Sequence, residues 1–127
     1  MSEIRILLVD DEAQVRDVLG HVLRAAGYTV LEAGNYYEGM RAAKDTTIDL
    51  LIADVSLPGP NGCELAARIL ETQPDMQVLF ISGYTGAEAC RAYGILSSDA
   101  HFLGKPFTAS DLLRKVHSVL HGPQPAP

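Results

Sequence analysis

The clearest indication of the fold is the segment Asp49-Leu50-Leu51-Ile52-Ala53-Asp54-Val55-Ser56-Leu57-Pro58-Gly59. Apolar residues lead to the carboxylate of Asp54, and Pro58-Gly59 follows, which predicts a strand that is buried on both faces and ends in a turn. Asp54 then lies at the mouth of a sheet. Burying a carboxylate there costs free energy unless a partner is present, so we expect Asp54 to have a chemical role in a functional site and not a role in folding. The structural alternative is that Asp54 caps the turn by accepting hydrogen bonds from backbone N–H groups.

On both sides of this stretch, short apolar segments of strand length alternate with segments of helical periodicity. The predicted strands are Ile4–Val9, Tyr28–Ala33, Asp49–Asp54, Gln77–Ile81 and Ala100–Leu103. The predicted helices run from Ala13 to a stop at Gly27, from Gly34-Asn35 to near Lys44, along Leu65, Ala66, Ile69 and Leu70 before Pro74, from Thr85 to Ile95, and from Thr108 to Gly122. This alternation predicts an α/β fold with a doubly wound parallel sheet.

The length and charge of the chain limit the classes of protein to which it can belong. With 127 residues it has room for one domain, which we place at residues 1–122, and the Pro-rich residues 123–127 are predicted to be a disordered tail or linker stub. The balance of 10 Lys and Arg against 16 Asp and Glu gives a net charge of −6, which disfavours nonspecific binding to nucleic acid or to an anionic membrane. No apolar run approaches the roughly 20 residues of a membrane span. Without metal-ligand spacing or a signal peptide, Cys63 and Cys90 are predicted to be buried thiols in a reducing cytosol.

Polar side chains follow the predicted strands at the points where the strands end. Asp10 and Asp11 follow the first strand, Asp54 ends the third, Ser82 follows the fourth, and Lys105 follows the fifth. Because ligands of doubly wound sheets bind beyond the carboxyl ends of the strands, we expect these residues to form one site. Carboxylates held close together repel one another unless a cation intervenes, and an open all-oxygen site suits Mg²⁺. An ammonium and a hydroxyl can bind phosphoryl oxygens, so the set predicts phosphoryl transfer onto Asp54.

The set Asp10-Asp11, Asp54, Ser82 and Lys105-Pro106 resembles the signature of the response-regulator receiver domain of two-component signal transduction, and the resemblance spans nearly the whole chain. It implies a flavodoxin-like fold of five strands and five helices, with a parallel sheet of order 2-1-3-4-5 and helices on both faces. It also implies that Asp54 is the phosphoacceptor, charged by a histidine kinase or a histidine phosphotransfer protein. The chain would then be a cytoplasmic signalling module without an output domain, and no enzyme beyond its own phosphorylation and autodephosphorylation.

The resemblance also implies how the site works. Asp10, Asp11, Asp54 and the backbone carbonyl of Ser56 would hold Mg²⁺, or Mn²⁺ in its place. Lys105 would pair with the phosphoryl group.

Further roles carry over from the same family. The peptide bond before Pro106 would be cis. Ser82 and Phe102 fit the hydroxyl and aromatic switch positions, while Ser56, Gly83 and Tyr84 fit positions that tune autodephosphorylation.

The predicted output follows from the charge of the phosphoryl group. Ser82 and Lys105 can satisfy its oxygens only by moving toward it, so the surface of the fourth helix, fifth strand and fifth helix would report the state to a protein partner. A homodimer that forms on phosphorylation is compatible with this scheme. The runs Phe80–Thr85 and Gly104–Phe107 are similar to receivers attached to hybrid histidine kinases, and a stand-alone receiver is the other option.

Two other classes share parts of the pattern. A Mg²⁺-dependent phosphohydrolase would use Asp54 as a transient nucleophile, but phosphatases of the haloacid dehalogenase type have a second Asp two residues later, where this chain has Ser56. An FMN-binding flavodoxin-like module needs a phosphate loop rich in Ser, Thr and Gly after the first strand. The acids Asp10-Asp11-Glu12 at that place would repel the phosphate. The receiver is therefore the main hypothesis, and the phosphohydrolase is the alternative.

Overall fold

The computed structural model describes residues 3–82 and 100–122. Within these ranges the elements, in chain order, are β1 (Arg5–Val9), α1 (Ala13–Ala25), β2 (Thr29–Ala33), α2 (Tyr36–Lys44), β3 (Leu50–Asp54), α3 (Gly62–Thr72), β4 (Gln77–Ser82), β5 (Ala100–Gly104) and α5 (Ala109–His121). The helix predicted over Thr85–Ile95 lies outside the described residues.

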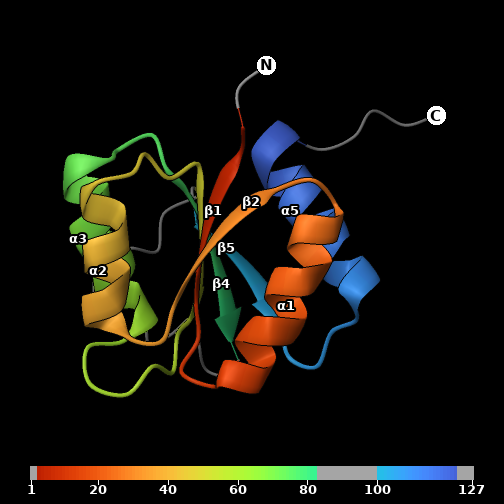
Figure 1. Cartoon of the computed structure of the whole chain (residues 1–127), viewed down its shortest axis with the longest axis horizontal. Helices are drawn as coiled ribbons and strands as arrows, with labels where there is room; N and C mark the ends of the chain where they lie inside the picture. The colour runs from red at the N-terminus through yellow and green to blue at the C-terminus, as the bar shows by residue number, and fades with distance from the viewer. Residues whose placement is uncertain (1–2, 83–99, 123–127) are drawn as a thin grey trace.

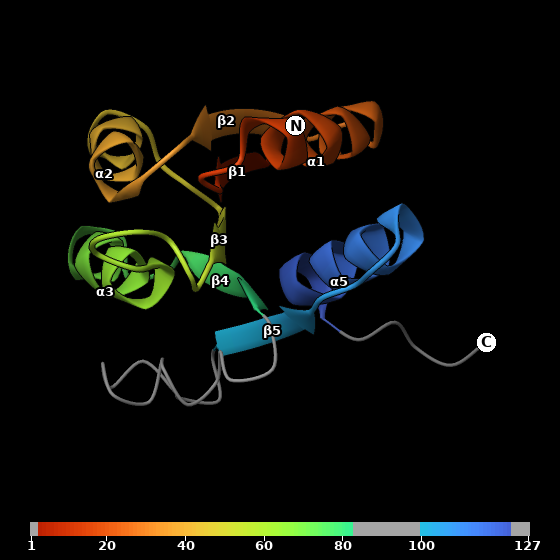
Figure 2. The ribbon, with the colours of Figure 1, turned by 90° about the horizontal axis from the view of Figure 1, so that it is seen from below.

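The strands form one parallel sheet of order β2-β1-β3-β4-β5. The helices cover both faces of this sheet, α2 and α3 on one and α1 and α5 on the other (Figures 1 and 2). The predicted doubly wound fold and strand order are therefore confirmed. After β2 the chain returns to the other side of β1, so the carboxyl ends of β1 and β3 become neighbours, with Val9 beside Ala53. This reversal is where such folds bind their ligands.

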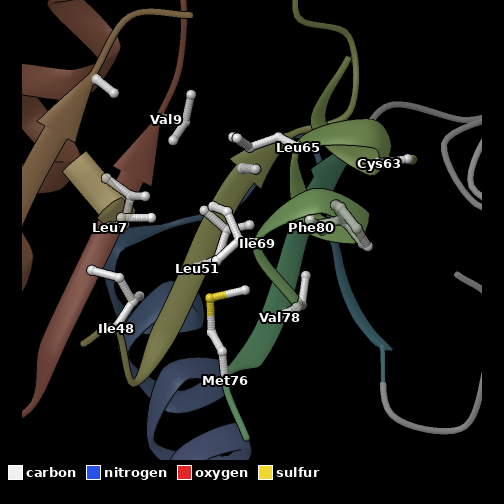
Figure 3. Close-up of a cluster of buried hydrophobic side chains, with 14 of the residues drawn as sticks. Leu7, Val9, Ile48, Leu51, Cys63, Leu65, Ile69, Met76, Val78 and Phe80 are labelled. Carbon is white, nitrogen blue, oxygen red and sulfur yellow. The ribbon is translucent and has the colours of Figure 1, made fainter. Parts of the chain in front are cut away.

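Two apolar clusters lie on opposite faces of the sheet. Along β1 and β3, Leu7 and Leu51 face the cluster beneath α2 and α3, while Leu8 and Ile52 face the cluster beneath α1 and α5. All four side chains have 0% exposed area. Burial on both faces explains why these strands read as continuous apolar runs instead of alternating patterns. Figure 3 shows the first cluster, with Leu7, Val9, Ile48, Leu51, Cys63, Leu65, Ile69, Met76, Val78 and Phe80 labelled.

One of the cysteines departs from its prediction. Cys63 is fully buried, as expected, but it is disulfide-bonded in the structure, so the prediction of a free thiol is wrong at this residue. The other cysteine of the chain, Cys90, lies outside the described residues.

Side-chain caps explain where three of the helices begin. The side chains of Asn35 and Asn61 accept hydrogen bonds from the backbone N–H groups of Glu38 and Glu64, at the first turns of α2 and α3. At α5, Thr108 forms a reciprocal capping box with the third helical residue. Caps of this kind satisfy backbone donors that a helix leaves unpaired at its start. In the parts of the chain that the structure describes, no helix combines the length and the apolar character of a membrane span.

Candidate functional site

Three carboxylates meet at the carboxyl ends of β1 and β3. Asp10 and Asp11 directly follow β1, and Asp54 is the last residue of β3. One carboxylate oxygen from each lies within 4.8 Å of the others. Asp10 and Asp54 are buried, at 2% and 6% exposed area, and Asp11 is exposed. The structure thus brings together three of the residues that the sequence singled out, at the edge where the fold predicts a ligand.

The two carboxylate oxygens of Asp10 differ in their hydrogen bonding within the described part of the chain. Its Oδ1 accepts a hydrogen bond of 2.9 Å from the backbone N–H of Glu12. Its Oδ2 is buried and has no hydrogen-bond partner among the described residues. Burial raises the pKa of Asp10, the Glu12 hydrogen bond lowers it, and the nearby charge of Asp54 raises it again, for a net increase. A buried carboxylate oxygen without a partner, inside an all-oxygen group, fits a hard divalent cation such as Mg²⁺.

Asp54 has a partner for each oxygen. Its Oδ1 accepts a 2.8 Å hydrogen bond from the backbone N–H of Ser56, and its Oδ2 pairs with Lys105 Nζ at 2.9 Å. The turn-capping alternative and the charged pairing are therefore both present in one side chain. Burial lowers the pKa of Lys105, but its hydrogen bond and charge interaction with Asp54 outweigh that effect and raise the pKa overall. Lys105 consequently stays an ammonium beside the acid group.

Ser82 ends β4 and Lys105 directly follows β5, and both strands lie on the side of β3 that is away from β1. Ser82 is buried at the end of β4, and its backbone carbonyl accepts a 3.0 Å hydrogen bond from the N–H of Lys105. This bond continues the pairing of β4 with β5 and places Lys105 next to β4. The Lys105–Pro106 peptide bond is cis, as predicted.

Two of the remaining predicted site residues, Phe102 and Ser56, lie within the described ranges. Phe102 is half-buried on β5, and its ring lies 5.4 Å from that of Phe80, centroid to centroid. Ser56 is exposed just after β3. Gly83 and Tyr84 lie outside the described residues.

Sequence reasoning missed one residue that touches the site. Arg16, in the first turns of α1, donates a hydrogen bond from Nη1 to the backbone carbonyl of Asp10 at 2.6 Å. In a helix that begins at Ala13, position 16 lies beside the end of β1. The predicted start of this helix was therefore the signal from which the contact could have been found. The residue type alone did not single it out, because arginines on helices are usually solvated.

A doubly wound sheet with an acid group and a lysine at its point of reversal places this chain among the α/β proteins that bind their ligands at the carboxyl ends of the strands. Comparison with known families makes the assignment specific. The chain belongs to the response regulator receiver domain family, whose match covers residues 6–117. Members of this family are signalling modules of two-component systems and bind Mg²⁺ at an acidic pocket.

Individual relatives agree with this assignment. The response regulator receiver protein CpdR of Brucella abortus is 34% identical over 116 residues, which cover 91% of this chain and 96% of CpdR. The phosphate regulon transcriptional regulatory protein PhoB of Pseudomonas aeruginosa is 33% identical, but the match covers only 51% of PhoB. A CheY-like receiver domain protein from Methanospirillum hungatei has a solved structure with a TM-score of 0.84, 30% identity and 94% of each chain covered. The chain therefore spans nearly all of one relative and about half of another.

Proposed function

We propose that this chain is a phosphoacceptor receiver, in which Asp54 takes a phosphoryl group from a phosphohistidine on a histidine kinase or a histidine phosphotransfer protein. The observation that carries the proposal is the position of Asp54. It ends a strand buried on both faces, lies within the acid group, and has one oxygen bonded to Lys105 Nζ at 2.9 Å. A nucleophilic carboxylate next to an ammonium and a cation site is the arrangement that phosphoryl transfer requires.

The transfer forms one bond and breaks another. A carboxylate oxygen of Asp54 attacks phosphorus, the phosphorus–nitrogen bond of the donor breaks, and the electron pair returns to the imidazole, which takes a proton from solvent. The product on Asp54 is an acyl phosphate. Mg²⁺, when bound, would neutralise charge on the phosphoryl oxygens. Asp10, Asp11, Asp54 and the Ser56 carbonyl are the proposed ligands, with Mn²⁺ as a substitute.

The other residues act after transfer. Lys105 releases the Asp54 oxygen and donates to a phosphoryl oxygen instead. The Ser82 hydroxyl moves toward the phosphoryl group, and Phe102 turns inward in the space that this movement leaves. Ser56, together with Gly83 and Tyr84 outside the described residues, tunes the rate of autodephosphorylation.

The proposed output surface consists of the helix predicted over Thr85–Ile95, β5 and α5. A phosphoryl group adds a charge of about −2 and three acceptor oxygens at the strand ends, which biases this surface between two states. The partner is a protein or a second copy of the phosphorylated chain, and the exchange takes place in the cytoplasm, where phosphohistidine donors act. The chain itself acts on no external substrate.

The test is phosphorylation with acetyl phosphate, followed by intact mass and phosphate-affinity gel mobility, with and without Mg²⁺. Wild type is expected to gain one acid-labile phosphoryl group only with Mg²⁺, and Asp54→Asn is expected to gain none. Asp49→Asn is the matched control. Asp49 precedes the same strand, but its carboxylate binds the backbone N–H of Arg5 at the opposite end of the sheet.

The other outcomes have distinct meanings. Steady release of phosphate that depends on Asp54, with no trapped adduct at any time point, would favour the phosphohydrolase or a very short-lived phosphoaspartate. An adduct that persists in Asp54→Asn would place the acceptor elsewhere. No adduct and no release would remove the phosphoacceptor role altogether.

A further inference from the structure

The guanidinium of Arg16 is bound to the backbone of an acid-group residue, although Arg16 lies on α1. Its Nη1 donates to the carbonyl oxygen of Asp10 at 2.6 Å, and its side chain has only 22% exposed area. A charge-assisted hydrogen bond this short is among the stronger contacts that a backbone carbonyl makes. The contact therefore ties helix α1 to the residue that opens the site.

Arg16 is itself held in place by the edge strand β2. Its Nε lies 3.8 Å from Oε1 of Glu32, while Oε2 of Glu32 pairs with Arg24 Nη1 at 2.8 Å. Arg24 also donates from Nη2 to the backbone carbonyl of Val30 at 3.0 Å. Only 24% of the side-chain area of Glu32 is exposed, so these ion pairs are less screened than pairs in open solvent.

The backbone next to β2 leaves room for this guanidinium. A Cβ atom on Gly34 would lie 3.1 Å from Arg16 Nη1, which is closer than such atoms ordinarily approach. Glycine at this position lets the guanidinium reach the Asp10 carbonyl. The guanidinium of Arg16 is therefore held by the Asp10 carbonyl and by Glu32, in space that Gly34 leaves open.

The contact with the Asp10 carbonyl has a consequence for both adjacent acids. The backbone N–H of Asp10 donates to Ala33 at 3.2 Å, and its Oδ1 accepts from Glu12. Fixing the carbonyl as well sets the plane of the peptide between Asp10 and Asp11, because a peptide unit is planar. That plane fixes where the backbone of Asp11 starts, so it restricts how the side chain of Asp11 can be directed relative to the buried Oδ2 of Asp10.

We propose that Arg16 is a positioning residue for the divalent-cation site, acting through the Asp10–Asp11 peptide plane that its hydrogen bond to the Asp10 carbonyl fixes. This inference rests on the proposed function, because it assigns a role in the cation site of the receiver. It predicts that Arg16 sets the affinity for Mg²⁺ even though its guanidinium is not a ligand. Groups that orient metal ligands in this way affect affinity by roughly 10- to 100-fold when removed.

Arg24 provides a matched control. It lies on the same helix, pairs with the same Glu32 and binds a backbone carbonyl of the same region, but that carbonyl belongs to Val30 on the edge strand and not to Asp10. If Arg16 merely attached α1 to the sheet, Arg16→Ala and Arg24→Ala would act alike. If Arg16 orients the acids, only Arg16→Ala changes Mg²⁺ binding.

The experiment measures the Mg²⁺ Kd by isothermal titration calorimetry on wild type, Arg16→Ala, Arg16→Lys and Arg24→Ala, with metal-free Tm recorded for each. We expect Arg16→Ala to weaken Mg²⁺ binding about tenfold, Arg16→Lys to show an intermediate loss because one donor is retained, and Arg24→Ala to stay within about twofold of wild type. The metal-free Tm is expected to fall for both alanine variants, since each loses an ion pair. The acid-labile adduct of wild type is measured in parallel.

The outcomes separate the two proposals. Equal Mg²⁺ affinities for Arg16→Ala and Arg24→Ala, in a wild type that binds Mg²⁺ and is phosphorylated, would overturn the positioning role alone. A wild type that neither binds Mg²⁺ nor is phosphorylated would overturn the proposed function and this inference with it. If Arg16→Ala does not fold, Arg16→Lys decides: a Mg²⁺ affinity equal to that of Arg24→Ala overturns the positioning role, and a weaker one supports it.

Discussion

At the scale of single residues, Asp10 and Asp54 differ although both are buried at the ends of neighbouring strands. Each oxygen of Asp54 has a partner, the Ser56 N–H or Lys105 Nζ. The Oδ2 of Asp10 has none within the described part of the chain. A buried polar atom without a partner costs about 1–3 kcal/mol, and more when it is charged. Asp10 is therefore the acid that destabilises the metal-free fold, and a bound cation would offset that cost.

Asp10→Asn removes the negative charge of the acid that has the unpartnered oxygen within the described residues. Removing this charge is expected to raise the metal-free free energy of unfolding by about 1 kcal/mol, because repulsion within the acid group falls. Wild type is expected to gain about 1.4 kcal/mol when Mg²⁺ is present at ten times Kd, and the variant is expected to gain far less. Urea unfolding with EDTA and with Mg²⁺ measures both quantities. A metal-free stability at or below that of wild type would contradict the account of Asp10.

The strand ends could be predicted from the sequence because apolar runs stop at them. The pattern placed Asp10, Asp11, Asp54, Ser82 and Lys105 at the carboxyl ends of strands, and the structure has them there. It did not reveal the Arg16 contact or the unpartnered oxygen of Asp10. Both depend on side-chain rotamers and on the direction of one carbonyl, which residue periodicity does not encode.

At the scale of elements, the junction of β3 and α3 is closely packed. The first residue of α3 is Gly62, and its N–H bonds to the carbonyl of Val55 at 3.3 Å. A Cβ atom there would overlap the carbonyl oxygen of Asp54 and lie 3.0 Å from its carbonyl carbon. The obstacle is backbone, which cannot turn aside as a flexible side chain can. A glycine at this place therefore allows α3 to begin directly behind Asp54.

Gly62→Ala is expected to destabilise the fold by about 1–3 kcal/mol, the usual cost of overpacking. Gly104→Ala is the control, because a Cβ atom on Gly104 meets no described atom within 4 Å and the residue does not have a positive φ. Thermal unfolding of the two variants in the same buffer compares them. Equal loss of stability in both would show that the close approach at Asp54 has no particular cost.

The start of α5 gives a pH-dependent prediction. Oδ2 of Asp111 accepts a 3.0 Å hydrogen bond from the backbone N–H of Thr108, and the Thr108 hydroxyl accepts one from the N–H of Asp111. Two contacts lower the pKa of Asp111. The hydrogen bond from the Thr108 N–H has the larger effect, and the contact with the Thr108 hydroxyl has the next largest. A carboxyl with a lowered pKa stabilises the fold above its unfolded pKa, and this contribution is lost as the pH falls through the folded pKa. The stabilisation is therefore complete at neutral pH.

Asp111→Asn is accordingly expected to lower stability at pH 7 and to differ little from wild type in acid, below the folded pKa. Thr108→Ala is expected to cost about 1 kcal/mol at neutral pH. In the Thr108→Ala background the effect of Asp111→Asn is expected to shrink, since the reciprocal bond is already weakened. Urea unfolding at several pH values measures all three variants. An Asp111→Asn effect that grows toward acid would refute the assignment.

At the scale of the whole molecule, apolar packing and site chemistry occupy different regions. The two clusters fill both faces of the sheet, while the acid group lies at its carboxyl edge. Because both of their faces are covered, β1 and β3 are nearly continuous apolar runs, which is why their predicted limits agree with the structure to within a residue. For example, Asp49–Asp54 was predicted and Leu50–Asp54 is observed. The disulfide bond of Cys63 could not be predicted in the same way, because bridging depends on distances in the folded chain.

This separation predicts that stability and metal binding vary independently. Ile69 on α3 has 1% exposed area within the cluster of Figure 3, so Ile69→Ala is expected to cost about 2–5 kcal/mol. Its exposed neighbour Glu71 is the control, and Glu71→Ala is expected to change stability by less than about 0.5 kcal/mol. Distant, independent sites contribute additively, so the increment in unfolding free energy that Mg²⁺ gives should be the same in both variants as in wild type. If Ile69→Ala abolished that increment while remaining folded, the α3 packing would be part of the cation site and the separation would be wrong.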